Sequence, residues 1–313
     1  MKKVNTARLN EPKRHHYIPQ FIIKNFADNE LGFVNYCDKK SGKIRKMPTE
    51  EIFMRRDLYR DEVNNPNDPV KIEKDFAKYE FEIAKIINEK ILNTNKISLS
   101  VEENDSLILF LALLHYRSEH WYKIMNKIEY EGSDSIFASY IKNENYIDFW
   151  RRNLGHLVNC RSVKEVVNHP NIDDPFKVYI GMDTFGLLGR YLVFADRRGE
   201  EDFFLSDAYP LYINGEGDNG VSFPLMTVFP ISPKRMIISA VRGVKATPLQ
   251  VRMFEKSFFS EPFLLEDGKT YQFTIRKMYK NEVNTINDGI YNQAKEGFAF
   301  IDEERFLVVD RNS

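Results

Sequence analysis

The spacing of apolar residues predicts that the first half of the chain is helical. Apolar side chains recur every three or four positions from about Val70 to Leu92, which is the period of an amphipathic helix. Ser100 and Glu103 form a capping box, which predicts the start of a second long helix that continues through an apolar stretch to about Ile128. Further helices are expected over Ser135–Asn153 and Ser162–Asn168.

After about Asp174 the pattern changes to short strand-like runs between loops rich in Gly, Pro and Asn. The strand-like runs are KVYIGMD, RYLVFAD, DFFLSD, MTVFPIS and RMIISA. Helices are expected over Pro248–Phe259 and Val283–Gly297, and FAFID with RFLVVD predicts a closing hairpin. Near the N-terminus, Phe33–Cys37 and Lys43–Met47 flank turn residues and predict another hairpin.

These elements together predict an α+β fold, with a helical first half and a mixed, largely antiparallel sheet in the second half. Residues 1–14 are polar and are expected to be loose. The remainder, residues 15–313, is expected to form a single α+β unit. The change of pattern also suggests a sub-domain boundary near residue 172.

Composition and charge narrow the classes of function. Of the 313 residues 42% are hydrophobic and 29% charged, an ordinary balance for a globular protein. The formal net charge of −1 gives no bulk positive field, so nucleic acid would have to bind at a local basic patch. The candidates for such a patch are Lys39, Lys40, Lys43, Arg45, Lys46, Arg55 and Arg56. The alternative is that this run is simply a solvated face of the predicted hairpin.

Targeting signals and cysteines point to the cytoplasm. The N-terminal segment has lysines but lacks the apolar core of a secretory signal. The most apolar stretch, Leu107–Leu114, is too short to span a bilayer, so no membrane association is expected. The two cysteines, Cys37 and Cys160, lie far apart and lack metal-ligand spacing, which indicates a reduced compartment.

The adjacent histidines His15 and His16 are the first candidates for chemistry. Neighbouring side chains point in different directions on a helix or a strand, so the pair is not expected to chelate one metal ion. The pattern His-His-x-x-Pro resembles the motif of the ββα-metal nucleases, in which Asn25 would fill the next position. The final histidine of that motif is missing, because Phe33 and Val34 stand there. The alternative is that both histidines are polar anchors.

Other polar candidates lie at the ends of apolar segments. Arg117 follows the most apolar run of the chain, so it requires a carboxylate partner or a bound phosphate. Glu80 lies at the margin of the apolar stripe of the first long helix, where a carboxylate can face a cleft or simply solvent. Ser206 and Asp207 end a strand-like run, and Asn287 lies on the last predicted helix, where it can cap or bind substrate.

Several segments together resemble a bacterial and fungal family known as domain of unknown function 4238. RHHYIPQFIIKNF resembles its opening motif, and IEKDFAKYE resembles its helix with two glutamates, here Glu73 and Glu80. LILFLALLHYRS resembles its apolar helix that ends in arginine, here Arg117. FFLSDAYP resembles its Ser-Asp-x-Pro segment with one extra residue, Tyr209. VFPISP and VNTINDGIYNQAKE, with Asn287 in the asparagine position, resemble its last two segments.

The resemblance implies a hypothesis about context. Some members of this family are associated with bacterial anti-phage defence loci, whose effectors are often nucleases or other toxic enzymes. The chain is therefore expected to be a defence effector, a hydrolytic or phosphoryl-transfer enzyme that acts on nucleic acid or nucleotide. A nuclease or another phosphoester hydrolase is the kind of enzyme that this hypothesis names.

The polar residues at the matched positions are expected to share one pocket. The predicted catalytic residues are His15, His16, Glu80, Arg117 and Asp207, and the predicted substrate-binding residues are Gln20, Ser206 and Asn287. Histidine with carboxylates suits a divalent ion such as Mg²⁺ or Mn²⁺, whereas histidine with arginine suits metal-free phosphodiester cleavage. Two alternatives remain open: a non-catalytic sensor or binding module for a phosphate-bearing or phage-derived ligand, and a buried polar network without chemistry.

Overall fold

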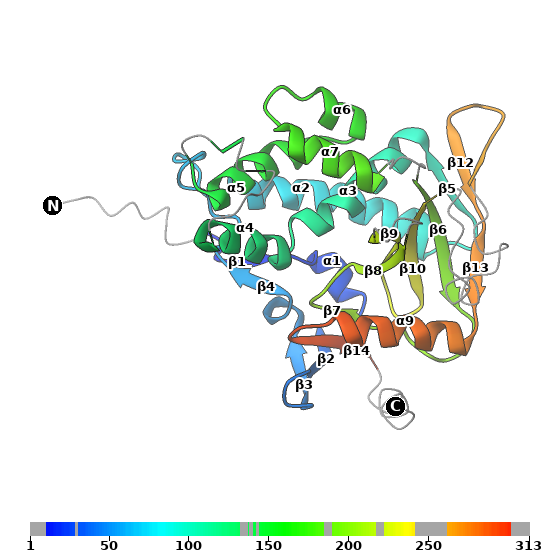
Figure 1. Cartoon of the computed structure of the whole chain (residues 1–313). Helices are drawn as coiled ribbons and strands as arrows, with labels where there is room; N and C mark the ends of the chain where they lie inside the picture. The colour runs from blue at the N-terminus through cyan, green and yellow to red at the C-terminus, as the bar shows by residue number, and fades with distance from the viewer. Residues whose placement is uncertain are drawn as a thin grey trace.

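The computed structural model describes residues 11–28, 31–131, 137, 140–141, 144–184, 190–216, 222–241 and 262–301 (Figure 1). Its helices gather in the first half of the chain and most of its strands lie in the second, so the α+β prediction is confirmed. The α-helices are α1 Gln20–Lys24, α2 Lys71–Lys85, α3 Val101–Tyr116, α4 Glu119–Glu131, α5 Tyr146–Leu157, α6 Val163–Asn168, α7 Asp174–Thr184 and α9 Lys280–Gln293. Two shorter turns of helix are η2 Thr49–Glu51 and η3 Ile86–Leu92.

The first long helix agrees with its prediction, whereas the second is divided in two. Helix α2 continues into η3, so helical backbone runs from Lys71 to Leu92. Helix α3 begins with the predicted capping box, in which the Ser100 hydroxyl accepts the Glu103 amide and the Glu103 carboxylate accepts the Ser100 amide. The expectation of one helix to Ile128 is wrong, because α3 ends at Tyr116 and α4 starts afresh at Glu119.

A serine explains this break. The Ser118 hydroxyl accepts the backbone amide of Trp121 at 3.3 Å, and the Ser118 carbonyl accepts the amide of Tyr122 at 3.2 Å. A serine at this place satisfies amides that the first turn of a helix leaves free, so it starts a new helix. The break leaves Arg117 between the two helices, where its side chain turns inward.

Two further expectations in the middle of the chain need correction. The run Lys177–Asp183, which was expected to be a strand, belongs to helix α7. Its buried residues Phe176, Ile180 and Thr184 lie four positions apart, so the helical period decides over the β-branched composition. Helix α5 covers the end of the helix expected over Ser135–Asn153; it begins at Tyr146, where the Asn145 side chain caps it by accepting the amide of Asp148 at 2.8 Å. Residues 135–136, 138–139 and 142–143 lie outside the described residues. Helix α6 begins after Ser162, as predicted.

The strands form four sheets. The largest has the order β13-β6-β10-β9-β8, and all its neighbours are antiparallel except β13 and β6. The others have the orders β3-β2-β14-β7, β11-β12-β5 and β1-β4. The strands are β1 Arg14–His16, β2 Phe33–Asp38, β3 Ile44–Pro48, β4 Met54–Arg56, β5 Ile97–Ser100, β6 Arg190–Arg197, β7 Leu205–Ser206, β8 Leu211–Glu216, β9 Ser222–Pro230, β10 Arg235–Val241, β11 Phe263–Leu264, β12 Thr270–Phe273, β13 Ile275–Met278 and β14 Gly297–Phe300.

Strand pairing joins the two halves of the sequence. Strand β14 lies between β2 of the first half and β7, and β12 pairs with β5 (Figure 1). The predicted hairpin of β2 and β3 is present, and α9 replaces the helix expected over Val283–Gly297 with slightly earlier bounds. The helix expected over Pro248–Phe259 and the second strand of the closing hairpin lie outside the described residues.

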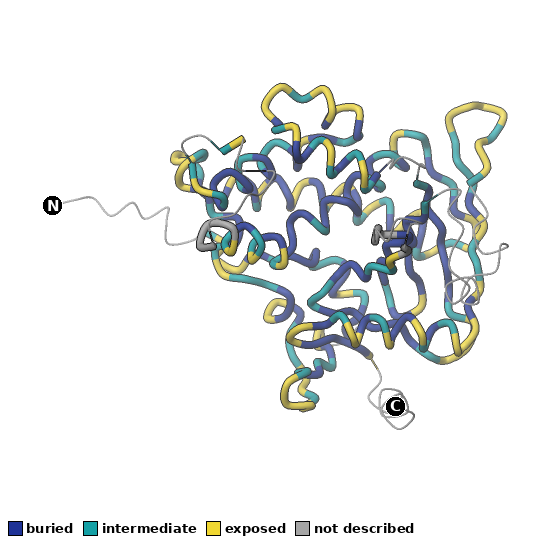
Figure 2. Tube along the Cα trace, viewed as in Figure 1, coloured by how far each residue is buried: buried dark blue, intermediate teal, exposed yellow. Residues whose placement is uncertain are grey.

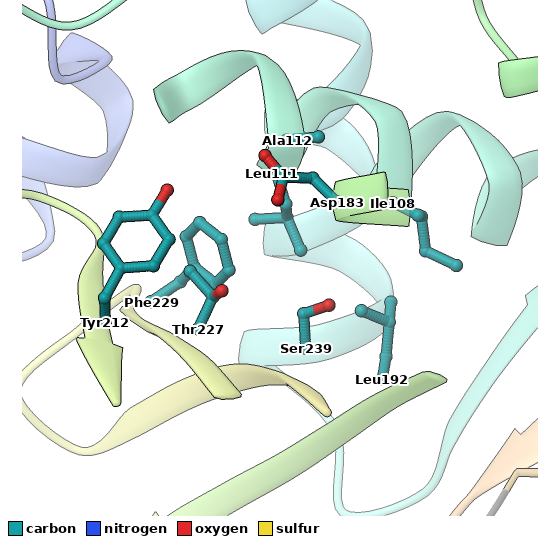
Figure 3. Close-up of a pocket in the computed structure, with 9 residues that line it drawn as sticks. All are labelled: Ile108, Leu111, Ala112, Asp183, Leu192, Tyr212, Thr227, Phe229 and Ser239. Atoms are coloured by element: carbon teal, nitrogen blue, oxygen red, sulfur yellow. The ribbon is translucent and has the colours of Figure 1, made fainter. Parts of the chain in front are cut away.

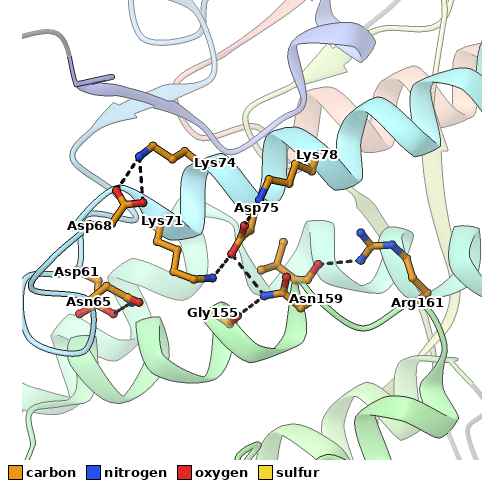
Figure 4. A network of polar contacts seen from close by, with 11 residues as sticks. Asp61, Asn65, Asp68, Lys71, Lys74, Asp75, Lys78, Gly155, Asn159 and Arg161 are labelled. Carbon is orange, nitrogen blue, oxygen red and sulfur yellow. Dashed lines mark hydrogen bonds and ion pairs between the residues drawn. The ribbon is translucent and has the colours of Figure 1, made fainter.

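The buried residues form a core between the helices and the large sheet. Figure 2 shows the buried segments along α2, α3 and α5 and along β6, β9 and β10. At the outer face of α2, the buried carboxylate of Asp75 pairs with Lys71 and with Lys78 at 2.9 Å (Figure 4). Asn159 donates to the same carboxylate at 3.5 Å, so this network ties α2 to the end of α5. Both lysines lie on α2 itself, so it is the Asn159 bond that connects this side of α2 to α5, while the other side of α2 carries the polar cluster described next.

Candidate functional site

The two adjacent histidines have different roles, and His15 is an anchor. Its side chain is completely buried and stacks on Tyr59 with ring centroids 5.7 Å apart. Its Nδ1 accepts the backbone amide of Tyr59 at 2.9 Å, and its Nε2 lies 3.1 Å from the carbonyl of Pro12, to which it donates. Burial lowers the pKa of this imidazole. Both ring nitrogens are used by the backbone, so His15 is a neutral structural residue.

His16 instead belongs to a polar cluster that also contains Gln20, Glu73, Glu80 and Arg117. The Gln20 amide nitrogen lies 3.1 Å from Nε2 of His16, so Gln20 donates and Nε2 accepts. Burial, reinforced by the positive charge of Arg117, lowers the pKa of His16 to about 4, although the backbone and the carboxylate of Glu50 oppose the shift. His16 is therefore a neutral imidazole at pH 7, with its proton on Nδ1.

Arg117 is the centre of the cluster. Its side chain is 1% exposed, and its guanidinium donates from Nη1 to Glu80 at 2.5 Å and from Nη2 to the carbonyl of His16 at 2.6 Å. Its Nε donates to the Tyr59 hydroxyl at 3.2 Å, and that hydroxyl donates back to the Arg117 carbonyl at 2.6 Å. The guanidinium also lies over the Phe76 ring, 3.9 Å from its centroid, an arrangement that favours a cation.

Two glutamates of helix α2 lie on the same side of the helix, seven residues apart, but in different environments. Glu80 is the ion-pair partner of Arg117 and remains 19% exposed. Glu73 is half-buried, and this burial raises its pKa to about 7. The positive charge of Arg117 opposes the shift only in part, and the negative charge of Glu80 adds to it. Its Oε2 atom is buried and has no hydrogen-bond partner among the described residues. Glu73 is thus a carboxyl group poised to exchange a proton near neutral pH.

The other predicted site residues lie outside this cluster. The carboxylate of Asp207 accepts the backbone amides of Lys295, Glu296 and Gly297 at 3.0 to 3.3 Å, so it caps the chain where α9 leads into β14. Burial nevertheless raises the pKa of Asp207. Ser206 is buried in β7, opposite β14.

Asn287 also makes its bonds to the backbone. It is buried on α9, where its side-chain oxygen accepts the amide of Phe204 at 3.1 Å and its nitrogen donates to the carbonyl of Asp202 at 2.8 Å. The predicted residues that the structure brings together are therefore His16, Gln20, Glu80 and Arg117.

A second polar region is enclosed between α3, α7 and the large sheet (Figure 3). There the Tyr116 hydroxyl donates to Asp183 at 2.6 Å, and burial raises the pKa of that carboxyl. The cavity beside Asp183, into which Tyr212, Thr227 and Ser239 also project, measures only about 10 Å³. This volume suits at most a single water molecule and excludes a substrate.

The described residues contain neither a metal-binding group of side chains nor a membrane-spanning helix. No three side chains of His, Cys, Asp or Glu in this part of the chain converge to hold a metal ion. The cluster around Arg117 contributes one imidazole and two carboxylates, and the guanidinium occupies the position next to Glu80 that a cation would need. None of the described helices is long and apolar enough to cross a membrane.

Sequence reasoning missed part of this cluster. Tyr59 and Phe76, which hold the guanidinium of Arg117, carry no recognisable motif. The seven-residue spacing of Glu73 from Glu80 places both on the same side of a helix, and this spacing is the sequence signal for Glu73 in the site. The environments of Glu73 and Glu80 differ because tertiary packing buries them to different extents, and a local sequence pattern does not encode this packing.

The fold and the cluster define an α+β protein with a buried arginine that links the N-terminal strand to two central helices. Residues 14–303 match the family model described as "Protein of unknown function (DUF4238)". The chain therefore belongs to this family, and the match covers every residue of the cluster. Comparisons with curated proteins and with solved structures gave no match.

Proposed function

We propose that this chain is a hydrolytic or phosphoryl-transferring enzyme that acts on nucleic acid or nucleotide, with Glu73 as its general acid and base. The observation that carries the proposal is the raised pKa of Glu73, about 7, on a carboxyl whose Oε2 lacks a protein partner. General acid–base catalysis works best when the pKa of the group lies near the operating pH. Two carboxylates whose environments differ are the usual sign of divided roles in acid–base chemistry.

Arg117 supplies positive charge at the same place. A guanidinium has five N–H groups, and the described contacts of Arg117 use three of them. Glu80 and Tyr59 hold the group rigidly, so its charge is preorganised toward Glu73 and toward any anion that reaches this side of the cluster. His16 and Gln20 stand at the other edge as neutral hydrogen-bonding groups that position a substrate.

The proposed step is the hydrolysis of a phosphoester. Protonated Glu73 gives its proton to the leaving oxygen as the P–O bond breaks, while a water oxygen forms the new bond to phosphorus. The water loses its proton to the Glu73 carboxylate, which restores the starting state. Arg117 stabilises the negative charge that builds up on the phosphoryl oxygens in between.

The defence role is part of the same proposal and is supported by the family resemblance. As an effector against phage, the protein would act in the cytoplasm, where phage nucleic acid and the nucleotide pool are found. The expected phenotype is protection of a bacterial culture that depends on Glu73.

The test compares Glu73→Gln with Glu89→Gln, an exposed glutamate of the neighbouring η3 segment. Cleavage of DNA, RNA and nucleotides is measured with and without Mg²⁺ or Mn²⁺, and phage plating and thermal melting are measured on the same variants. We expect Glu73→Gln to lose roughly 100-fold or more in rate while it stays folded, and Glu89→Gln to behave as wild type. Wild-type activity in Glu73→Gln would overturn the assignment of the acid and base.

A second candidate is a non-catalytic sensor or binding module for a phosphate-bearing or phage-derived ligand. It is favoured by the two N–H groups of Arg117 that its described contacts leave over, which suit a phosphate acceptor. Ligand binding without turnover by wild-type protein on all three substrate classes would select this candidate.

A further inference from the structure

One row of side chains across the large sheet is polar although it faces the core. Tyr212, Thr227 and Ser239 lie directly opposite one another on β8, β9 and β10, so their side chains leave the same face of the sheet. We call them the hydroxyl row. Thr227 and Ser239 are each only 7% exposed. The neighbouring pair on this face, Phe229 and Ile237, is apolar and buried, so the hydroxyl row interrupts an apolar surface.

The hydroxyl groups of this row have no hydrogen-bond partner among the described residues. A buried hydroxyl that makes no hydrogen bond is costly, and native proteins satisfy nearly all such groups with protein atoms or with ordered water. Three hydroxyls side by side therefore require a partner from elsewhere.

Asp183 faces the hydroxyl row from α7, across the cavity between the helices and the sheet (Figure 3). Its Oδ2 accepts the Tyr116 hydroxyl at 2.6 Å, whereas its Oδ1 has no hydrogen bond to a described residue. The cavity thus brings one carboxyl oxygen and three hydroxyl groups together. The rest of its lining is apolar and consists of Ile108, Leu111, Ala112, Leu192 and Phe229.

The size and the polar groups of this cavity match one water molecule. The cavity measures about 10 Å³, close to the smallest volume that holds a water. A buried water typically makes about three hydrogen bonds to polar groups that the protein leaves unsatisfied. It can donate to the Asp183 oxygen and can both donate to and accept from hydroxyl groups. Cavities that stay empty are lined by apolar groups, which this one is not.

We infer that this cavity binds one ordered water molecule, which donates to Asp183 and shares hydrogen bonds with the hydroxyl row. The volume excludes a larger ligand, and the convergence of polar groups on one point excludes a dry cavity. The inference does not depend on the proposed function, because none of these groups belongs to the cluster around Arg117.

The water connects the sheet to the residue that precedes Arg117. Tyr116 is the last residue of α3, and its hydroxyl donates to Asp183. The Tyr116 carbonyl accepts the indole nitrogen of Trp150 at 2.8 Å. The path from the hydroxyl row through the water and Asp183 therefore ends on Tyr116, and it helps to fix the end of α3 at which Arg117 leaves the helix.

The first experiment is a crystal structure of the full chain at a resolution that shows ordered water. We expect density for one water within hydrogen-bond distance of Asp183 and of the hydroxyl row. Oxygen-17 relaxation dispersion, which detects long-lived internal water in solution, should give a smaller signal for Thr227→Val with Ser239→Ala than for wild type. This double variant removes two hydroxyls of the row and adds no bulk.

The second experiment uses the sign of the change in melting temperature of the same double variant. If the hydroxyls bond a water, their removal leaves the Asp183 oxygen without its partner, and the melting temperature should fall by about 2 °C or more. If the hydroxyls are unsatisfied, their removal should raise it, because unpaired buried polar groups are costly. Thr285→Val, at an exposed position of α9, is the control and should melt as wild type.

A dry cavity in the wild-type crystal structure would overturn the inference, and so would a double variant that melts at or above the wild-type temperature. The wild-type crystal structure decides the question even if the double variant does not fold. Glu73→Gln should keep the water, so a loss of cleavage in that variant concerns the proposed function alone.

Discussion

Replacement of Arg117 by alanine tests the structural core of the cluster most directly. Arg117→Ala removes the charged partner of Glu80, the donor to the His16 carbonyl and the cation over Phe76. Breaking a fully buried ion pair costs roughly 3 to 5 kcal/mol. Glu80 is 19% exposed and can recover part of its hydration, which lowers that cost. The orphaned carbonyl adds about 1 kcal/mol or more, so we expect a loss of about 3 to 4 kcal/mol in the free energy of unfolding.

The assay is urea unfolding at pH 7.5 followed by circular dichroism. The matched control is Arg45→Ala, since Arg45 also forms an ion pair but its side chain is 59% exposed and the distance to Asp38 is 3.8 Å. That pair should contribute less than about 1 kcal/mol. A double variant, Arg117→Met with Glu80→Leu, should recover part of the lost stability, because replacing both partners leaves no buried unpaired charge.

Unfolding of Arg117→Ala at the same urea concentration as wild type would contradict a stabilising role for this ion pair. That result would mean that the Arg117 guanidinium is solvated and that its removal does not destabilise the Glu80 carboxylate. A double variant less stable than Arg117→Ala would also contradict it, because the damage would then come from lost volume and not from the unpaired carboxylate.

The remaining predictions concern single side chains. Glu73 has a pKa of about 7 in the folded protein against an ordinary 4.5, so its contribution to stability is greatest at low pH. The free energy of unfolding should fall by up to about 3 kcal/mol as the pH rises from 4.5 to 7. Denaturant melts of Glu73→Gln should show a flatter dependence of stability on pH. His15→Ala should cost about 2 to 4 kcal/mol, because it leaves a buried amide of Tyr59 without a partner, and a melting temperature equal to wild type would contradict this. His16→Ala should stay within about 1 kcal/mol of wild type, since Arg117 bonds the backbone of His16, but it should lower activity or ligand binding. Asp207→Asn should cost about 1 to 2 kcal/mol through its backbone bonds and leave catalytic rates unchanged, as stopped assays on the folded variant would show.

The sequence predicted those parts of the fold in which local and tertiary preferences agree. The long helix α2, the capping box at Ser100 and the hairpin of β2 and β3 all have strong local signals and are confirmed. The errors fall where two local signals compete. The run 177–183 has strand-like composition, but burial of Phe176 and Ile180 on one face selects a helix, and Ser118 interrupts a helix whose apolar pattern continues past it.

The candidate site was predictable in its residue types and only partly in its geometry. The demand that Arg117 find a carboxylate follows from its place in an apolar run, and Glu80 is that partner. The prediction could not distinguish polar residues that face a site from those that satisfy the backbone. Asp207 and Asn287 look like site residues in the sequence, yet their side chains accept or donate to amides and carbonyls that only the folded chain brings near them.

The two histidines show how one position along a strand separates a buried anchor from a side chain that faces a polar cluster. Along β1 the side chains alternate, so His15 enters the core beside Tyr59 while His16 turns toward Gln20. The carbonyl of His16 holds Arg117, and Arg117 in turn lowers the pKa of the His16 ring. The backbone carbonyl of His16 thus holds the guanidinium of Arg117, and that positive charge helps to keep the His16 side chain neutral. Because His16 is neutral and Glu73 has a pKa of about 7, Glu73 and not the histidine pair is the group of this cluster that can exchange a proton near pH 7.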